Sequence, residues 1–155
     1  MKRIIELGHT STLEHSLITY EVSGISRALL QENSRHRIGV SPSVESTRYT
    51  FKRALAGDNI EETLCLSGND EIDVANRLHM ENIKRIVKEN NLSNDIAKYG
   101  LVEAYKTNLI LSFNLRSLMH FYKLRSSKNA LKEIQILAKM LVQKLPEEYK
   151  QFFEK

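Results

Sequence analysis

The segment from Arg35 to Tyr49 gathers the side chains best suited to chemistry. It holds an Arg-His-Arg run, several serines and a further arginine, and Glu45 is its only acid. Guanidinium groups bind phosphate through paired hydrogen bonds, and hydroxyl and backbone N–H groups add further donors. The pattern therefore predicts a site for a small anion such as a nucleotide phosphate. A solvated basic loop and a contact with nucleic-acid phosphates are the alternatives.

Two other polar groups allow both a functional and a structural interpretation. His9, Glu14 and His15 superficially resemble a metal ligand set. The separation of the two histidines does not place them on one helix face, so a capped turn with one structural histidine is favoured and no metal site is predicted. The other group is a polar face on a predicted helix, made of Asn114, Arg116, His120 and Arg125.

The sequence lacks the patterns of a protein nucleophile. It has no P-loop, no GxGxxG motif, no convincing Ser-His-Asp set and no carboxylate pair for acid-base work. Cys65 is the only cysteine, and no basic residue beside it would favour a reactive thiolate. An active site of arginines, histidines and hydroxyls is more typical of an enzyme whose cofactor performs the difficult chemistry.

The elements that position these residues are mostly helices. The chain has only two prolines and six glycines, so long regular elements are expected. Hydrophobic spacing predicts strands over 16–22 and 107–114, and helices over 25–33, 70–89, 93–100, 115–125 and 128–145. Gly24 is expected to end the first strand, and residues 34–46 are expected to lack regular structure. Asn114 is expected to cap the helix that follows, which brings Arg116 and His120 onto one face.

Composition describes an ordinary globular chain. With 155 residues, 41% hydrophobic and 27% charged, it is long enough for one domain over residues 1–155. No apolar run is long enough to cross a membrane and no signal peptide is apparent, which predicts a cytoplasmic location. The net charge of +4 is modest and acids are interleaved, so neither nucleic acid nor membrane is expected as a partner.

The residues of the basic segment match a known signature. RHRIGVSPSVESTRY resembles the motif of the flavin-dependent thymidylate synthases, which is Arg-His-Arg, a spacer, Ser, one residue and Arg-Tyr. GHTSTLEH at 8–15 is similar to a second family segment, and NLRSLMHFYKLR at 114–125 is similar to a third. The three segments follow one another in the family's order. The resemblance covers about residues 8–49 and 94–125.

The resemblance implies an α/β (α+β) fold, mainly helical, with a central sheet flanked by helices. It implies a homotetramer whose active sites draw on several subunits, with FAD and dUMP bound together. The implied reaction is the reductive methylation of dUMP to dTMP, with methylenetetrahydrofolate as carbon donor and NADPH as the reductant of the flavin. No enzyme cysteine attacks the base in this family, which agrees with the setting of Cys65.

The resemblance also implies roles for individual positions. The residues implied to contact the flavin are Ser11, Arg35, His36, Arg37, Asn114, Arg116 and His120. Those implied to hold the nucleotide are Glu32, Ser46, Arg48, Lys98 and Arg125, where Lys98 takes the place of a family arginine. Arg125, Ser46 and His9 are the implied catalytic residues, and Arg125 would stabilise charge that develops on the pyrimidine.

The chain departs from the family pattern at several places. It starts almost at the GHTSTLEH segment, so the strand and helix that usually precede this segment are expected to be missing. His120 stands where the family commonly has Asn, and Thr12 where it commonly has Pro. Two alternatives follow: a degenerate relative that binds FAD or nucleotide without turnover, and a nucleic-acid-binding module that uses the basic segment from Arg35 to Arg48.

Overall fold

The computed structural model describes residues 7–57 and 59–153, and these fall into two compact units. The first unit consists of the described residues of Met1–Glu21, Gln31–Ser43 and Ile110–Lys155. The second consists of those of Val22–Leu30 and Val44–Leu109. None of the helices in this described part combines the length and the apolar character that a bilayer crossing requires. The prediction of one domain over residues 1–155 stays a prediction.

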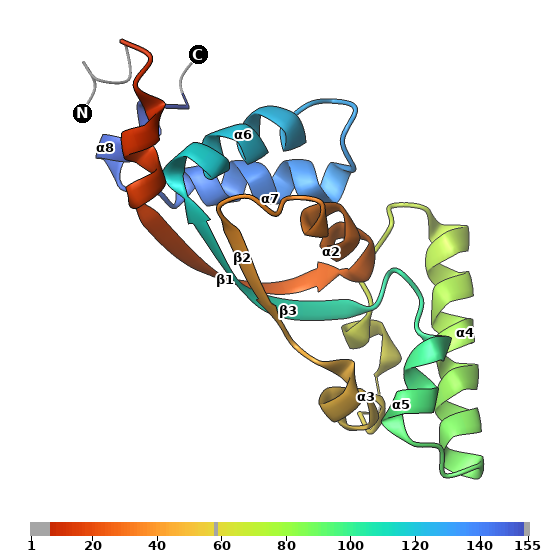
Figure 1. Ribbon diagram of the computed structural model, residues 1–155. Coiled ribbons are helices and arrows are strands. Elements are labelled where there is room, and N and C mark those ends of the chain that lie inside the picture. The colour runs from red at the N-terminus through yellow and green to blue at the C-terminus, as the bar shows by residue number, and fades with distance from the viewer. Residues whose placement is uncertain (1–6, 58, 154–155) are drawn as a thin grey trace. The chain divides into compact units, whose positions relative to one another are not determined.

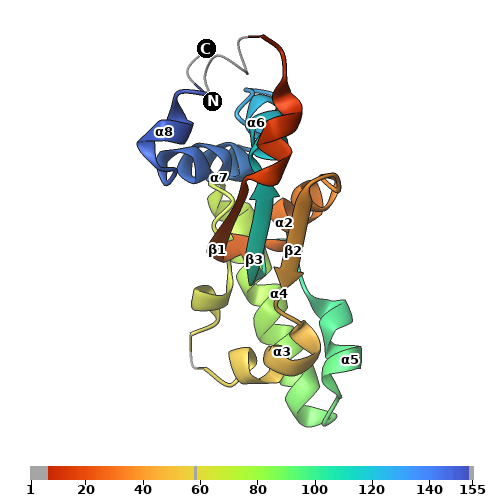
Figure 2. The same ribbon diagram turned by 60° about the vertical axis from the view of Figure 1, so that its left-hand side comes forward.

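Three strands form one sheet in the order β1-β3-β2 (Figures 1 and 2). They are β1 (Leu17–Ser26), β2 (Val40–Val44) and β3 (Lys106–Asn114). Residue numbers fall along β3 as they rise along each neighbour, because Asn114 N–H donates to Gly39 O and Glu45 N–H to Asn108 O. The sheet is therefore antiparallel, with β3 in the centre.

The central strand confirms the prediction made from alternation. Leu109, Leu111 and Phe113 are buried, whereas Ile110 between them is 44% exposed. Successive side chains of a strand point to opposite faces, so one face of β3 packs into the interior. Its last residue, Asn114, is at the same time the cap of the next helix.

Two predictions about the outer strands are wrong. Gly24 was expected to end the first strand, but it adopts a φ of 70° inside β1, and the strand continues to Ser26. Residues 34–46 were expected to be irregular, but Val40–Val44 form β2. Pro42 is tolerated there because β2 is an edge strand, where one side of the backbone needs no ladder partner.

In the first unit, the helices are η1 (Thr10–His15), α6 (Leu115–Arg125), α7 (Lys132–Gln143) and α8 (Glu147–Lys150). Figure 1 shows α6 and α7 side by side, and they pack directly against each other. Leu118 and Phe121 of α6 and Ile134 of α7 are completely buried. The helix predicted over 128–145 is shorter, because residues 128–130 form a turn, Leu131 is the N-cap residue and α7 ends at Gln143.

In the second unit, the long helix α4 (Asp70–Glu89) matches its predicted limits, and Asn69 caps it by accepting from Ile72 N–H at 3.0 Å. It packs with α3 (Thr47–Leu55), η2 (Ile60–Thr63), α5 (Asn94–Ala97) and η3 (Lys98–Gly100) around a core that includes Phe51 and Met80. The helix α3 was not predicted. The remaining helix, α2 (Arg27–Ser34), continues from β1 and leads into the Arg-His-Arg segment.

Candidate functional site

A cavity of about 720 Å³ lies within the first unit. Its walls come from η1, the segment after α2, the start of β2 and the first half of α6. The lining residues are Glu14, Arg35, His36, Arg37, Ile38, Val40, Asn114, Arg116, Ser117 and His120. Six of the seven positions expected to contact a flavin are among them, and the volume is in the usual range for a small-molecule site.

The N-terminal half of α6 supplies one wall. The Asn114 side chain caps the helix by accepting a hydrogen bond from Ser117 N–H at 2.8 Å. Arg116 and His120 are one turn apart, so they project on the same side, as their spacing predicts. Leu115, Leu118 and Phe121 point the other way and are completely buried. The helix therefore presents its polar stripe to the cavity because its apolar stripe is held in the core.

The opposite wall is the Arg-His-Arg segment, which hydrogen bonds hold against α6. The Ser117 hydroxyl donates to Ile38 O at 2.8 Å, and Asn114 N–H donates to Gly39 O at 2.9 Å. Gly39 has a φ of 65°, and a side chain there would overlap the Asn114 and Ser117 side chains. Glycine is therefore needed at this position for both conformation and space.

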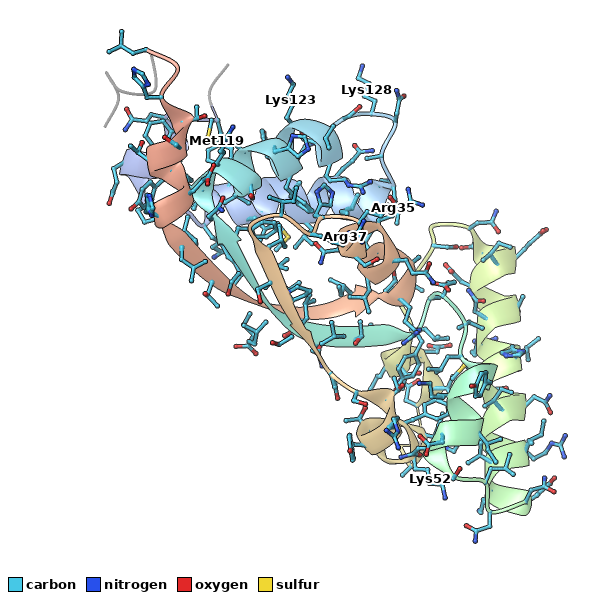
Figure 3. All side chains as sticks on the ribbon, viewed as in Figure 1. Arg35, Arg37, Lys52, Met119, Lys123 and Lys128 are labelled. Atoms are coloured by element: carbon cyan, nitrogen blue, oxygen red, sulfur yellow. The ribbon has the colours of Figure 1, made fainter. Side chains whose placement is uncertain are left out.

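The cavity is basic at its rim. Arg35 is 72% exposed and lies 3.6 Å from Glu32, and Arg116 pairs with Glu14. Within the described part of the chain no ion pair involves Arg37, which is exposed. Figure 3 shows Arg35 and Arg37 on the segment that leaves α2. Three guanidinium groups around one cavity suit a ligand with more than one phosphate.

A second group of site residues is more buried and lies beside this cavity. Arg125, at the C-terminal end of α6, is only 14% exposed. Its Nη1 donates to a Glu32 carboxylate oxygen at 2.6 Å and its Nε to His36 Nε2 at 2.8 Å. Burial, followed by the charges of Arg125 and His120, lowers the pKa of His36, and Glu32 opposes this shift. No local pattern in the sequence predicts this contact, because Arg125 and His36 are 89 residues apart.

The second unit holds the remaining nucleotide candidates. Ser46 directly precedes α3 and Arg48 lies in its first turn, where exposed helix N–H groups and a guanidinium favour an anion. Arg48 donates from Nε to Asp95 at 2.6 Å, and the pKa of Asp95 is lowered, first by that hydrogen bond. The charges of Arg48 and Lys98 lower this pKa further, while burial opposes the shift.

The two expected positions at the start of η1 are not part of the cavity wall. His9 and Ser11 are exposed at the start of η1, and neither lines the cavity. Glu14 from the same segment does line it and pairs with Arg116. The sequence had suggested Glu14 only as part of a disfavoured metal set. Asp95 was missed altogether, since no periodicity connects it with Arg48.

Comparisons with known proteins agree with the motifs. A family model described as "Thymidylate synthase complementing protein" matches residues 1–149. The flavin-dependent thymidylate synthase of Campylobacter jejuni strain RM1221 is 50% identical, over 94% of this chain and 73% of its own length. That of Helicobacter pylori strain 26695 is 45% identical, over 94% of this chain and 75% of its own.

Solved structures give the same result. A crystal structure of thymidylate synthase X from Helicobacter pylori with FAD and dUMP has a TM-score of 0.89 at 40% identity, and it covers 99% of this chain and 80% of that one. A second structure of that enzyme, also complexed with FAD and dUMP, has the same TM-score at 41% identity. The α/β fold inferred from the motifs is thereby confirmed.

Proposed function

Because the chain belongs to the flavin-dependent thymidylate synthase family, we propose that it is an FAD-dependent enzyme that methylates dUMP to dTMP. The observation that carries this function is the cavity lined by Arg35, Arg37 and Arg116 together with His36 and His120. We propose methylenetetrahydrofolate as the carbon donor and NADPH as the reductant, as the sequence resemblance implies.

The cavity residues fit the charge of FAD. The three arginines offer charge-assisted donors for its diphosphate, and Asn114 and Ser11 are further polar groups of the proposed contact set. When bound, the flavin supplies the electrons that reduce the transferred carbon to a methyl group. The protein's own part is to hold the diphosphate with Arg35, Arg37 and Arg116, and to orient the ring system with His36 and His120.

The nucleotide set is proposed from the same motifs. Ser46 and Arg48 combine a hydroxyl, helix N–H groups and a guanidinium, which suits a nucleotide phosphate. Lys98 would add charge to this set. Arg125 would donate to the pyrimidine and stabilise negative charge that develops there, with Glu32 as its neighbour. His9 completes the proposed catalytic set with Ser46 and Arg125.

We propose in addition that the protein is a cytoplasmic homotetramer of single-domain chains, with no nucleic-acid or membrane partner. The tetramer would have four times the 17.9 kDa mass of one chain. Light scattering on a size-exclusion column measures this directly. A monomer at micromolar concentration would contradict the proposed assembly.

The first experiment is spectroscopic and uses the purified full chain. FAD is added, and the visible absorption is followed under anaerobic NADPH with and without dUMP; methylenetetrahydrofolate is then added and dTMP is measured. We expect bound flavin, faster bleaching with dUMP, and dTMP formation. Bound flavin without dTMP would indicate the degenerate relative. A colourless protein that binds DNA or RNA with steep salt dependence would support the nucleic-acid alternative.

A charge-matched pair tests the cavity. Arg37→Ala should weaken FAD binding by about tenfold or more, since a hydrogen bond to a charged group contributes on the order of 1.5–3 kcal/mol. Lys123→Ala removes an exposed cation from α6 that does not line the cavity, and Figure 3 shows it projecting away from the helix. This control should bind FAD normally. Equal losses in both variants would mean that general charge, and not the cavity, attracts FAD.

Arg125→Ala tests the proposed catalytic role. Turnover should fall by at least about a hundredfold, the usual cost of one lost donor to developing charge, whereas flavin should remain bound. Retained methylation of dUMP in this variant would contradict the role of Arg125.

A further inference from the structure

Arg125 is held by three contacts, one from each nitrogen of its guanidinium. Its Nε donates to His36 Nε2 at 2.8 Å, its Nη1 to Glu32 Oε2 at 2.6 Å, and its Nη2 to the Glu32 backbone oxygen at 2.9 Å. A guanidinium has five N–H groups, so one remains on each terminal nitrogen. The side chain is therefore fixed in direction before any ligand arrives, and it keeps donors to offer.

The contact with His36 defines the protonation state of that ring. An arginine Nε always carries a hydrogen and has no lone pair to accept with. His36 Nε2 must therefore be the acceptor, and the ring is neutral with its hydrogen on Nδ1. Burial lowers the His36 pKa most, the charges of Arg125 and His120 on α6 lower it further, and the charge of Glu32 on α2 raises it. Arg35 and Arg37 flank His36 in the chain.

Contacts with neighbouring residues orient the His36 ring so that its Nε2 points toward Arg125. The Phe121 ring meets it edge to face, with 4.8 Å between ring centroids, and His120 lies 6.5 Å away. The backbone N–H of His36 donates to Asn33 O at 3.0 Å, which fixes the chain where it leaves α2. The ring is thus held from both its backbone and its face.

We propose that neutral His36, protonated on Nδ1, is a positioning residue that holds Arg125 in the orientation in which it binds the nucleotide. This inference rests on the proposed function, in which Arg125 contacts dUMP. Protonation of His36 would place an N–H opposite the Arg125 Nε–H and a second positive charge beside the guanidinium. The contact would break, and the affinity for dUMP would fall in acid.

The test is a pH series of dUMP binding by calorimetry, from pH 5 to 8.5, on the FAD-loaded protein. His36→Gln keeps an oxygen near the place of Nε2 that accepts from Arg125 and does not titrate. We expect dUMP affinity to fall further toward pH 5 in the parent protein than in His36→Gln. The titration of the dUMP phosphate affects both proteins equally and cancels in this comparison. His79→Gln, which changes a histidine of α4 bonded to Gly100 O, should keep the parent profile.

A second variant and a direct measurement complete the test. His36→Phe has no acceptor, so its dUMP affinity should be lower at every pH, by about tenfold. Long-range ¹H–¹⁵N NMR of the unmodified protein should show the Nδ1-protonated tautomer of His36 at pH 8. The Nε2-protonated tautomer, or identical acid dependence in the parent and His36→Gln, would overturn the inference. Absence of dUMP binding at every pH would instead overturn the proposed function, and the NMR result would still decide whether His36 accepts from Arg125.

Discussion

The arginines of the site differ in their exposure and in their ion-pair partners. Arg125 is only 14% exposed and contacts Glu32 and His36, whereas Arg48 is more than half exposed and pairs with Asp95. Arg116 pairs with Glu14. An exposed pair contributes little to stability, because water screens it. The acid beside Arg48 should therefore matter more for ligand binding than for folding.

Asp95→Asn should strengthen dUMP binding. The carboxylate occupies Nε and Nη2 of Arg48, at 2.6 and 3.3 Å, which are the donors a phosphate would use. An amide at position 95 leaves the charge of the Arg48 guanidinium uncompensated. We therefore expect the affinity for dUMP to rise by about threefold at low salt, and by less at high salt because ions screen the charge. Calorimetric titration with dUMP measures this.

The matched control for Asp95→Asn is Glu89→Gln. Glu89 pairs with Arg85 on α4 with similar exposure of both partners. Its removal should leave dUMP affinity unchanged. Weaker binding in Asp95→Asn would show that Asp95 orients Arg48 and does not compete with the phosphate.

The sequence could predict residues that belong to one element and not those that meet across elements. Arg116 and His120 were placed together correctly, because helical spacing alone brings them to one face. The partners Arg48 and Asp95 are 47 residues apart, and Arg125 and His36 are 89 apart. No local sequence pattern predicts contacts between residues so far apart. The contact of Asp95 with Arg48 and that of His36 with Arg125 are therefore visible only in the structure.

Among the elements, predictability follows the strength of the hydrophobic pattern. The strand β3 alternates buried and exposed residues, and α4 has both an apolar stripe and an asparagine cap, so both were predicted. The strand β2 has no fully buried residue. Its sequence VSPSV does alternate polar and apolar residues, but serine and proline are poor strand formers, so the propensity of the segment did not indicate a strand and its pairing with β3 makes it one.

The cap of α6 joins helix stability to the site. Asn114→Ala should lower the free energy of unfolding by about 1 kcal/mol, the usual effect of losing an N-cap side chain. It should also weaken FAD binding severalfold, because Asn114 lines the cavity. Urea unfolding and a flavin titration measure the two effects.

The control for Asn114→Ala is Asn69→Ala, which removes the corresponding cap of α4. Asn69→Ala should lower the free energy of unfolding by a similar amount and leave FAD binding unchanged. If both variants lost FAD binding equally, loss of stability would explain the effect and Asn114 would have no direct role.

Gly39→Ala should lower the free energy of unfolding by more than the conformational strain alone predicts. A left-handed conformation costs a non-glycine residue on the order of 1–2 kcal/mol. Gly24 has a similar φ, 70° against 65°, but a side chain there meets nothing within 4 Å. Gly24→Ala should therefore show the strain only, and Gly39→Ala should show a larger loss of stability and weaker FAD binding. Urea midpoints and FAD affinities that match in the two variants would show that Gly39 does not hold the cavity wall in place.

For the whole molecule, the site residues are distributed over two compact units. The proposed flavin set and Arg125 belong to the first unit, and Ser46, Arg48 and Lys98 belong to the second. All three strands run through both units, as their residue ranges show. Composition and length suggested one domain, and this subdivision has no marker in the sequence, since no linker rich in glycine or proline separates the parts.

Global stability should fall at alkaline pH through Tyr20. Its hydroxyl donates to Leu141 O of α7 at 3.0 Å, and burial raises its pKa from 10.0 to about 12. Above pH 10 the unfolded chain releases this proton while the folded chain keeps it. The stabilisation is therefore complete below pH 10 and is lost between pH 10 and 12.

The difference in the free energy of unfolding between the parent and Tyr20→Phe separates the effect of Tyr20 from that of other groups that titrate in the same pH range. Tyr20→Phe should be about 1 kcal/mol less stable near pH 7, because it lacks one hydrogen bond, and the gap should narrow as the pH approaches 12. Tyr99→Phe, at a side chain that is 88% exposed, should follow the parent. A constant gap in the urea midpoints of Tyr20→Phe across this range would show that Tyr20 does not contribute to the alkaline loss.

The two sides of the site are far apart in the sequence, and this separation determines the order in which they are synthesised on the ribosome. His36 is made 89 residues before Arg125, and Glu14 is made 102 residues before Arg116. At 5–20 residues per second, the basic segment waits roughly 4–18 s for its partner in α6 to be synthesised. The proposed cofactor can be captured only after α6 has emerged, so its loading is a late step in the protein's biogenesis.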